Sequence, residues 1–189
     1  MIELLISTAL IATAYVVVLG PGSALGQKSR KAKCVQQLEQ MHQALSLYAA
    51  EHDGAFPSVP GATTAEAPLS LLVPLYTSDT SVFICPGTGR GALPAGQPFA
   101  DRKISYAYSS GLRREAAPGA ILVADALTDT LGKREGEALF STQGSGPGSN
   151  HRRYGGNVLF VDGHVETFPA TAPRELRPPA GAALLNPKP

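Results

Sequence analysis

The N-terminal part of the chain carries two different hydrophobic patterns. From Ile2 to Leu19 the residues are almost all apolar, and Glu3 is the single charge. A helix that packs on a soluble domain has polar residues at every third or fourth position, and this segment does not. At 1.5 Å rise per residue it is about 27 Å long, which predicts a helix in a membrane or in a bundle of helices.

The second pattern follows Gly20-Pro21-Gly22, where we expect the helix to kink or melt because proline donates no helix hydrogen bond. From residue 27 onward, apolar residues recur at three- and four-residue steps, which is typical of one helix face. These residues are Val35, Leu38, Met41, Leu45 and Tyr48. The pattern predicts a helix that packs on a sheet and ends near Asp53-Gly54.

Four later segments have the length and the β-branched or aromatic content of strands. They are Ile104–Tyr108, Ala120–Ala124, Asn157–Val161 and His164–Phe168. The last two flank Asp162-Gly163, which predicts a β-hairpin closed by a type I′ turn. The segments between the strands are rich in glycine and proline and predict loops.

The composition fits one domain with extensions at both ends. The chain has 189 residues, 43% hydrophobic content and a net charge of +1. This suggests a transmembrane or filament-core helix over 1–26, a globular domain over 27–168 and an extended proline-rich tail over 169–189. The basic run from Lys28 to Lys33 is more typical of a solvated helix flank than of a binding patch, so we expect no nucleic-acid partner.

Both ends of the chain resemble known families. Ile2–Leu5, Lys33-Cys34 and Gly54–Pro57 resemble the start of type IV pilin-like proteins. Asn150-His151 and Asp162–Val165 resemble the C-terminal motif of the prepilin-type processing-associated proteins, in which nine residues separate a histidine from Asp-Gly. In this chain ten residues, 152–161, lie between them.

The resemblance implies an α+β, pilin-like fold. Its long N-terminal helix would span a membrane with its first half and pack with its second half on an antiparallel sheet of about four strands. The implied location is the bacterial inner membrane, with a single pass and the C-terminal domain in the periplasm or on an extracellular filament.

The implied function is that of a structural subunit of a type IV pilus-like or type II secretion pseudopilus filament. Such a subunit associates with its own copies and with other pilin-like subunits, and its N-terminus is cleaved and methylated. Glu3 matches the glutamate that, in this family, pairs with the terminal amine of a neighbouring subunit during assembly. The alternative is an envelope-anchored binding module for a glycan or protein ligand, which would use the long loops.

The two cysteines, Cys34 and Cys85, are expected to form a disulfide. An oxidising periplasm favours this bond, which contributes up to roughly 4 kcal/mol of stability. The alternative is two unrelated buried thiols. A pair without Cys-x-x-Cys spacing does not suggest structural zinc.

The remaining candidate sites have structural explanations. His151, Asp162 and His164 suit zinc or nickel, but Asp162-Gly163 is required by the turn, and each histidine has a local explanation. The acidic residues of the preceding loop lack the spacing of a calcium loop; they are Asp125, Asp129, Glu135 and Glu137. Because neither a Gly-x-Ser-x-Gly elbow nor a recognisable Cys-His pair occurs, we expect no catalytic residues, no cofactor, no metal and no enzymatic activity.

Overall fold

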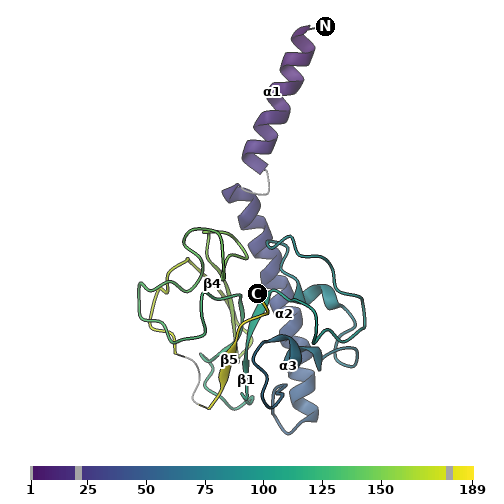
Figure 1. Cartoon of the computed structure of the whole chain (residues 1–189), viewed down its shortest axis with the longest axis vertical. Helices are drawn as coiled ribbons and strands as arrows, with labels where there is room; N and C mark the ends of the chain where they lie inside the picture. The colour runs from purple at the N-terminus through teal and green to yellow at the C-terminus, as the bar shows by residue number, and fades with distance from the viewer. Residues whose placement is uncertain (1, 20–22, 178–180) are drawn as a thin grey trace.

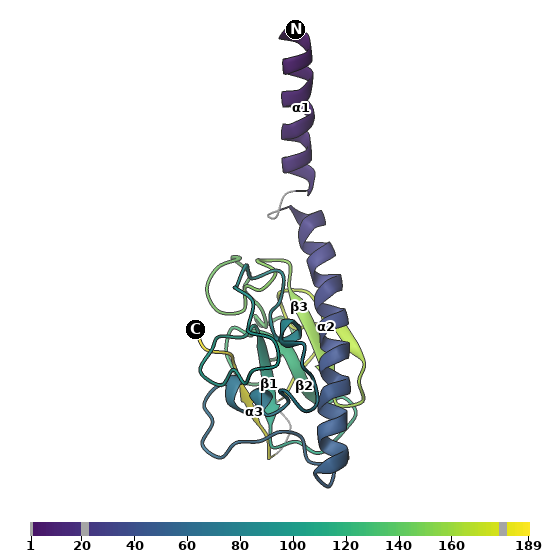
Figure 2. The same cartoon turned by 90° about the vertical axis from the view of Figure 1, so that its right-hand side faces the viewer.

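Two consecutive helices dominate the N-terminal third of the chain. The computed structural model describes residues 2–19, 23–177 and 181–189, so the predicted kink at 20–22 lies outside the described residues. Helix α1 (Ile2–Leu19) projects away from the domain, and α2 (Ala24–Glu51) lies along it (Figures 1 and 2). The Ser23 side chain caps α2 by accepting a 3.0 Å hydrogen bond from the backbone N–H of Gly26.

The predicted membrane span is wrong, and with it the single-pass location in the inner membrane. Within the described residues, no helix has both the length and the apolar character needed to cross a bilayer. The expected single long helix is also not present, because α1 ends at Leu19 and α2 begins at Ala24. At about 27 Å, α1 is shorter than a hydrocarbon core of roughly 30 Å, and Glu3 lies in its first turn.

The sheet has five strands where about four were expected. They are β1 (Tyr106–Ser110), β2 (Ile121–Asp125), β3 (Gly156–Phe160), β4 (Val165–Phe168) and β5 (Ala183–Leu185). Their order is β4-β3-β2-β1-β5, and every neighbouring pair is antiparallel. The additional strand, β5, comes from the region predicted to be an extended tail. Its short apolar sequence pairs with β1, placing Ala183 opposite Ser110.

One face of the sheet packs against α2. The stripe predicted for this helix is confirmed at Leu38, Met41 and Leu45, which are fully buried, whereas Val35 and Tyr48 are half-buried. The facing side chains of the sheet belong to the same core as the helix residues. They include Tyr106, Tyr108, Leu122, Val123 and Leu159.

The opposite face of the sheet carries a second core, which loops cover. Alternate strand residues such as Ala107, Val158 and Phe160 pack there with Leu127 and Phe140 from the segment after β2. Ala172 and Leu176, from the region predicted as a tail, complete this core. Both faces are therefore covered, which explains why every residue of β1, β2 and β3 is buried.

Short elements complete the domain on the side of α2. Helix α3 (Glu66–Ser70) and the 3₁₀ helix η1 (Thr80–Phe83) lie in the segment between α2 and the sheet. The Asp79 side chain caps η1 by accepting a 2.9 Å hydrogen bond from the backbone N–H of Ser81. Because η1 contacts α2, it directs the chain that follows it toward the helix.

The predicted hairpin is present, but its turn is not of type I′. The backbone N–H of Gly163 donates to the Phe160 carbonyl, and the backbone N–H of Phe160 donates to the His164 carbonyl. Gly163 has a φ of 92°, whereas Asp162 is not among the residues with positive φ. A three-residue loop with glycine in the left-handed region therefore joins the strands. A Cβ at residue 163 would also lie 2.7 Å from the His42 ring, so that ring would have to move.

Glycine is required at position 155, just before β3, because the backbone has a positive φ and there is no room for a Cβ atom. Its φ is 78°, and a Cβ would lie 2.1 Å from the carbonyl oxygen of Phe168. We expect Gly155→Ala to lower the free energy of unfolding by about 1–3 kcal/mol more than Gly136→Ala. Gly136 is the matched control, because its φ is 86° but nothing lies within 4 Å of its Cβ position. Denaturant titrations measure both, and equal losses would contradict the assigned close contact.

Candidate functional site

Four side chains with metal-binding or nucleophilic chemistry meet in the interior of the domain. They are Cys34 of α2, Cys85 after η1, Asp125 at the end of β2, and His151 before β3. One ligand atom from each lies within 4.8 Å of all the others. All four residues have 0% exposure. Hereafter these residues are called the buried cluster.

Local structure determines how each residue reaches the cluster. Cys34 lies on the buried face of α2, one turn before Leu38. Cys85 follows η1, and the next loop can approach His151 because residue 87 is glycine. A Cβ at Gly87 would lie 2.1 Å from the Asn150 carbonyl oxygen and 2.8 Å from His151 Nδ1. No other residue type fits at this position.

Hydrogen bonds hold the Asp125 carboxylate in place. Its Oδ1 accepts from Asn150 Nδ2 at 2.8 Å, and its Oδ2 accepts from the backbone N–H of Asn157 at 2.7 Å. His151 Nε2 lies 3.4 Å from Oδ2. A Cβ at Gly156 would lie 3.0 Å from Asp125 Cβ, so a small residue is needed there as well. A buried carboxylate requires such partners, because desolvation disfavours its charged form.

The sulfur atoms are in contact with each other and with His151. Cys34 Sγ lies 2.7 Å from Cys85 Sγ, and Cys85 Sγ lies 3.4 Å from His151 Nε2. The backbone N–H of Gly87 also donates to Cys85 Sγ at 3.3 Å. On the other side of the imidazole, Nδ1 is buried, and no group among the described residues hydrogen-bonds to it.

These contacts shift the proton equilibria of the cluster. Burial by itself raises the pKa of Cys34, but hydrogen bonds with Cys85 and His151 outweigh it and lower this pKa to about 7. Burial by itself lowers the pKa of His151, but the Asp125 carboxylate and Cys34 outweigh it and raise this pKa to about 9. Burial and the contact with Cys34 raise the pKa of Cys85 well above its usual range. The arrangement therefore favours a thiolate on Cys34 beside a protonated His151.

The predicted pairing of Cys34 with Cys85 is compatible with this geometry. The structure brings both sulfur atoms together although 50 residues, 35–84, separate them in sequence, and it records both as free thiols. The disulfide itself stays a prediction. A nucleophilic role toward an outside substrate is not favoured, because both cysteines have 0% exposure.

The structure separates the three residues considered as a metal site around the hairpin. His151 lies in the buried cluster, whereas Asp162 and His164 pair with each other at 2.6 Å on the exposed turn. Of these residues, Asp162 has a pKa below its usual range, because hydrogen bonds from His164 outweigh the opposing effect of burial. Gly163 serves the turn, as expected.

The acidic residues considered as a calcium site also lie apart and have different partners. Asp125 is in the buried cluster, and Asp129 pairs with Lys133 at 2.5 Å. Glu137 accepts a hydrogen bond from the backbone N–H of Arg134, and Glu135 is exposed. In the part of the chain that the structure describes, these residues do not gather into a ligand group.

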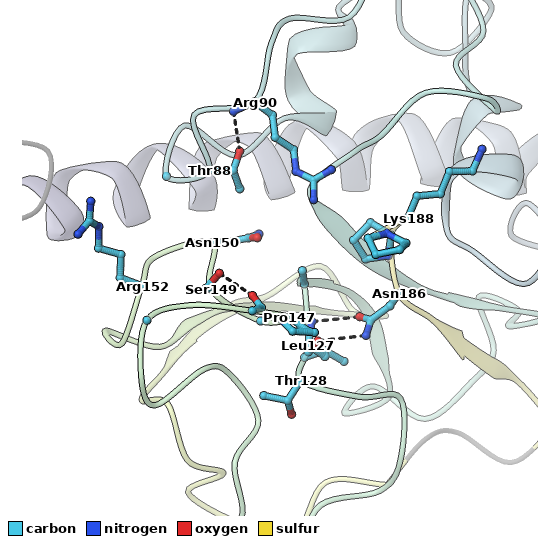
Figure 3. Close-up of a pocket in the computed structure, with 17 residues that line it drawn as sticks. Thr88, Arg90, Leu127, Thr128, Pro147, Ser149, Asn150, Arg152, Asn186 and Lys188 are labelled. Carbon is cyan, nitrogen blue, oxygen red and sulfur yellow. Dashed lines mark hydrogen bonds between the residues drawn. The ribbon is translucent and has the colours of Figure 1, made fainter.

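A cavity of about 880 Å³ opens beside the buried cluster. It is bounded by Gly87–Arg90, by the loop from Gly144 to Arg152, and by the C-terminal segment Asn186–Pro189 (Figure 3). Asn186 holds the C-terminal wall through hydrogen bonds with the backbone N–H and carbonyl of Leu127. Among the described residues, the lining contains Arg90, Arg152 and Lys188 but no aspartate or glutamate.

Glu3, which is predicted to act in assembly, lies in the first turn of α1, far along the chain from the cluster. The large apolar side chains of this helix are 55–74% exposed; they are Ile2, Leu4, Leu5, Ile6, Leu10, Ile11, Tyr15, Val16 and Val17. Exposed apolar surface of this extent marks a site of interaction with other molecules.

Sequence reasoning missed the partnership of His151 with Asp125. Asp125 was considered only with the acidic residues that follow it, because the two residues are 26 positions apart and share no short motif. One available signal was the position of an acidic residue directly after the apolar run AILVA. A carboxylate at the end of a central strand lies where the loops leave the sheet, and functional residues often gather there.

Replacing Asp125 tests the importance of the cluster for stability. We expect Asp125→Ala to lower the free energy of unfolding by about 3–5 kcal/mol, because His151 and the backbone N–H of Asn157 lose a buried partner. Asp129→Ala is the control and should cost about 1 kcal/mol or less, because its ion pair is partly exposed. Similar losses for both variants, measured by urea denaturation, would show that the cluster does not hold the domain together.

Comparisons of the chain with family models, with curated proteins and with solved structures give no match. The resemblance to pilin-like proteins therefore rests on the residues quoted above.

Proposed function

We propose that the protein is a structural subunit of a filament of the type IV pilus-like or type II secretion pseudopilus class. Copies of α1 would pack side by side to form the filament core, and the globular domains would surround that core. The observation that carries this proposal is the exposure of the apolar side chains of α1. In Figures 1 and 2, α1 extends beyond the domain and the sheet does not cover it.

The gain from covering α1 is large compared with the stability of a domain. Burying one large aliphatic side chain contributes about 1.5–3 kcal/mol. Each copy of α1 presents several such side chains, while the core under α2 is already filled by residues of the domain. Association with other copies therefore buries apolar area that folding of a single chain leaves in water.

The polar residues of α1 are compatible with apolar neighbours. The hydroxyls of Ser7, Thr8 and Thr13 donate to backbone carbonyls three or four residues earlier, at 2.8–3.0 Å. Their hydrogen-bonding capacity is thus largely used within the helix, and they do not require water or a polar partner. Glu3 is the charged side chain of the helix and needs a cationic partner once it is covered.

The distribution of apolar residues favours an open assembly over a simple dimer. Exposed apolar side chains at Leu4, Leu5 and Ile6 point in successive directions around the helix, so a single partner helix covers only part of them. Several neighbours are needed, and a head-to-tail contact repeated between copies provides them. A helical filament with α1 at its centre satisfies this requirement.

A binding module for an anionic glycan or protein segment is the second candidate, and the cavity beside the cluster favours it. The described part of its lining includes Arg90, Arg152 and Lys188 and contains no aspartate or glutamate. The two candidates differ in self-association, because a filament subunit must associate with other copies and a binding module need not. The state of the purified full chain in solution distinguishes them.

Introducing a charge on α1 tests the filament proposal. We expect Ile11→Asp to abolish filaments seen by negative-stain electron microscopy and to leave the melting temperature of the domain unchanged, because a carboxylate in an apolar helix bundle is strongly destabilising. The matched control is Leu131→Asp, which changes an equally exposed residue, 72% against 70%, in the domain. Filaments that persist in Ile11→Asp, or a wild-type chain that stays monomeric, would refute the proposal.

Glu3 should act in assembly and not in folding. We expect Glu3→Ala to reduce incorporation into filaments at least several-fold when it is co-expressed with tagged wild-type subunits, because the mutant cannot pair with a neighbouring amine. Its thermal unfolding should match that of the wild type, since Glu3 lies outside the core. Equal incorporation of the mutant and wild-type chains would contradict this role.

A further inference from the structure

We propose that Cys34, Cys85, Asp125 and His151 bind one zinc ion when both cysteines are in the thiol form. The four residues come from four separate segments, and one ligand atom of each lies within 4.8 Å of the others. This inference goes beyond filament assembly and does not depend on it, because the site lies entirely within the globular domain.

The donor set matches the preferences of zinc. Two thiolates, an imidazole and a carboxylate are the protein ligands that this ion accepts, and four ligands suit its tetrahedral geometry. Hard ions such as calcium and magnesium require six or more oxygen ligands or retain water, and the cluster offers neither. The complete burial of all four residues is typical of a closed structural site.

The groups around the cluster hold its ligands in place. Asn150 Nδ2 and the backbone N–H of Asn157 each donate to a different oxygen of Asp125, so Oδ1 keeps a lone pair for a metal ion, while Oδ2 also faces His151 Nε2 at 3.4 Å. The backbone N–H of Gly87 points at Cys85 Sγ at 3.3 Å. Outer hydrogen bonds of this kind orient ligands in metal sites and tune their basicity.

Binding of the ion requires a small adjustment of the sulfur atoms. Their separation is 2.7 Å, whereas two thiolates at 2.3 Å from one tetrahedral zinc are about 3.8 Å apart. The sulfur atoms must therefore separate by about 1 Å, which side-chain rotation of Cys85 in its loop can provide. His151 Nε2 faces both Asp125 and Cys85, so the ring already presents a ligand atom to this position.

A cavity and a counter-charge lie near the site. The cavity of about 880 Å³ is lined by Gly87 and Asn150, which are close neighbours of Cys85 and His151 in the chain, and Figure 3 shows Asn150 at its wall. A zinc ion with two thiolates, one carboxylate and a neutral imidazole leaves a net charge of −1. Lys31 is half-buried and interacts electrostatically with Asp125, so it partly compensates this charge.

Zinc binding and a disulfide exclude each other, because both use the same two sulfur atoms. The experiment therefore begins with the full chain kept under a phosphine reductant without oxygen, and thiol labelling first verifies two free thiols per chain. After removal of metal with a chelator, the protein is titrated with Co²⁺, a spectroscopic substitute for zinc. The expected result is one Co²⁺ per chain with tetrahedral visible bands and thiolate-to-cobalt charge transfer, all lost on addition of Zn²⁺.

Variants identify the ligands. Cys34→Ser should reduce the charge-transfer intensity about twofold, and Asn150→Ala should raise the Kd for Co²⁺ about 10–100-fold, because it removes a hydrogen bond to the Asp125 ligand. His164→Ala is the control and should bind as the wild type does, since His164 lies on the exposed hairpin. Circular dichroism checks that each variant is folded.

Two outcomes would overturn the zinc site. One is the lack of a cobalt spectrum in wild-type protein with two verified free thiols, and the other is a charge-transfer band that persists unchanged in Cys34→Ser. Filament formation is scored separately by electron microscopy. A failed zinc test with intact filaments, or the reverse, therefore shows which of the two proposals is wrong.

Discussion

The structure depends most on one buried carboxylate. Asp125 ends the central strand β2, where water cannot solvate its charge, so the protein must supply hydrogen-bond donors. It does so with the Asn150 side chain and the Asn157 backbone, which fixes the loop before β3 and the start of β3 against β2. His151 is placed beside the same carboxylate, and the sulfur atoms of α2 and of the η1 loop close the arrangement. Burial of one charge thus specifies how four distant segments meet.

The globular domain and helix α1 differ in whether their apolar side chains are buried. The domain buries its apolar residues within itself, on both faces of the sheet. Helix α1 leaves its apolar residues exposed and has its polar hydroxyls bonded to its own backbone. The domain therefore folds around its own core, and α1 remains available to make contacts between chains.

Periodic sequence patterns predicted the helices and the longer strands well, but they did not predict the short strand β5 or the type of hairpin turn. The stripe from Leu38 to Leu45 and the four strand segments were found within about two residues, because a helix or strand that buries one face must repeat with the period of its backbone. The strand β5 was missed because Ala183–Leu185 is too short to show a period among the surrounding prolines. The type I′ turn was wrong because the dipeptide Asp-Gly is compatible with more than one hairpin loop.

The buried cluster could be predicted only in part. The proximity of Cys34 to Cys85 was expected from the number of cysteines, but the addition of Asp125 and His151 was not. Their contact is set by the pairing of β2 with β3 and by close packing at Gly87 and Gly156, and neither is encoded in a local pattern. The membrane span was wrong although α1 has the predicted bounds, Ile2–Leu19, because within the described residues no helix is long and apolar enough to cross a bilayer.

The spacing between His151 and Asp162 has a structural explanation that involves no shared site. At one end of β3, His151 contacts Asp125; at the other end, the hairpin turn approaches His42 of α2, whose Nε2 lies 3.3 Å from the Val161 carbonyl oxygen. The five residues of β3 therefore supply half of the ten residues between His151 and Asp162. Residues 152–155 and Val161 supply the rest, and Arg152 and Gly155 have φ values of 57° and 78°. An additional residue is accommodated most easily in this irregular segment, because an insertion within β3 would move every following side chain to the opposite face of the sheet.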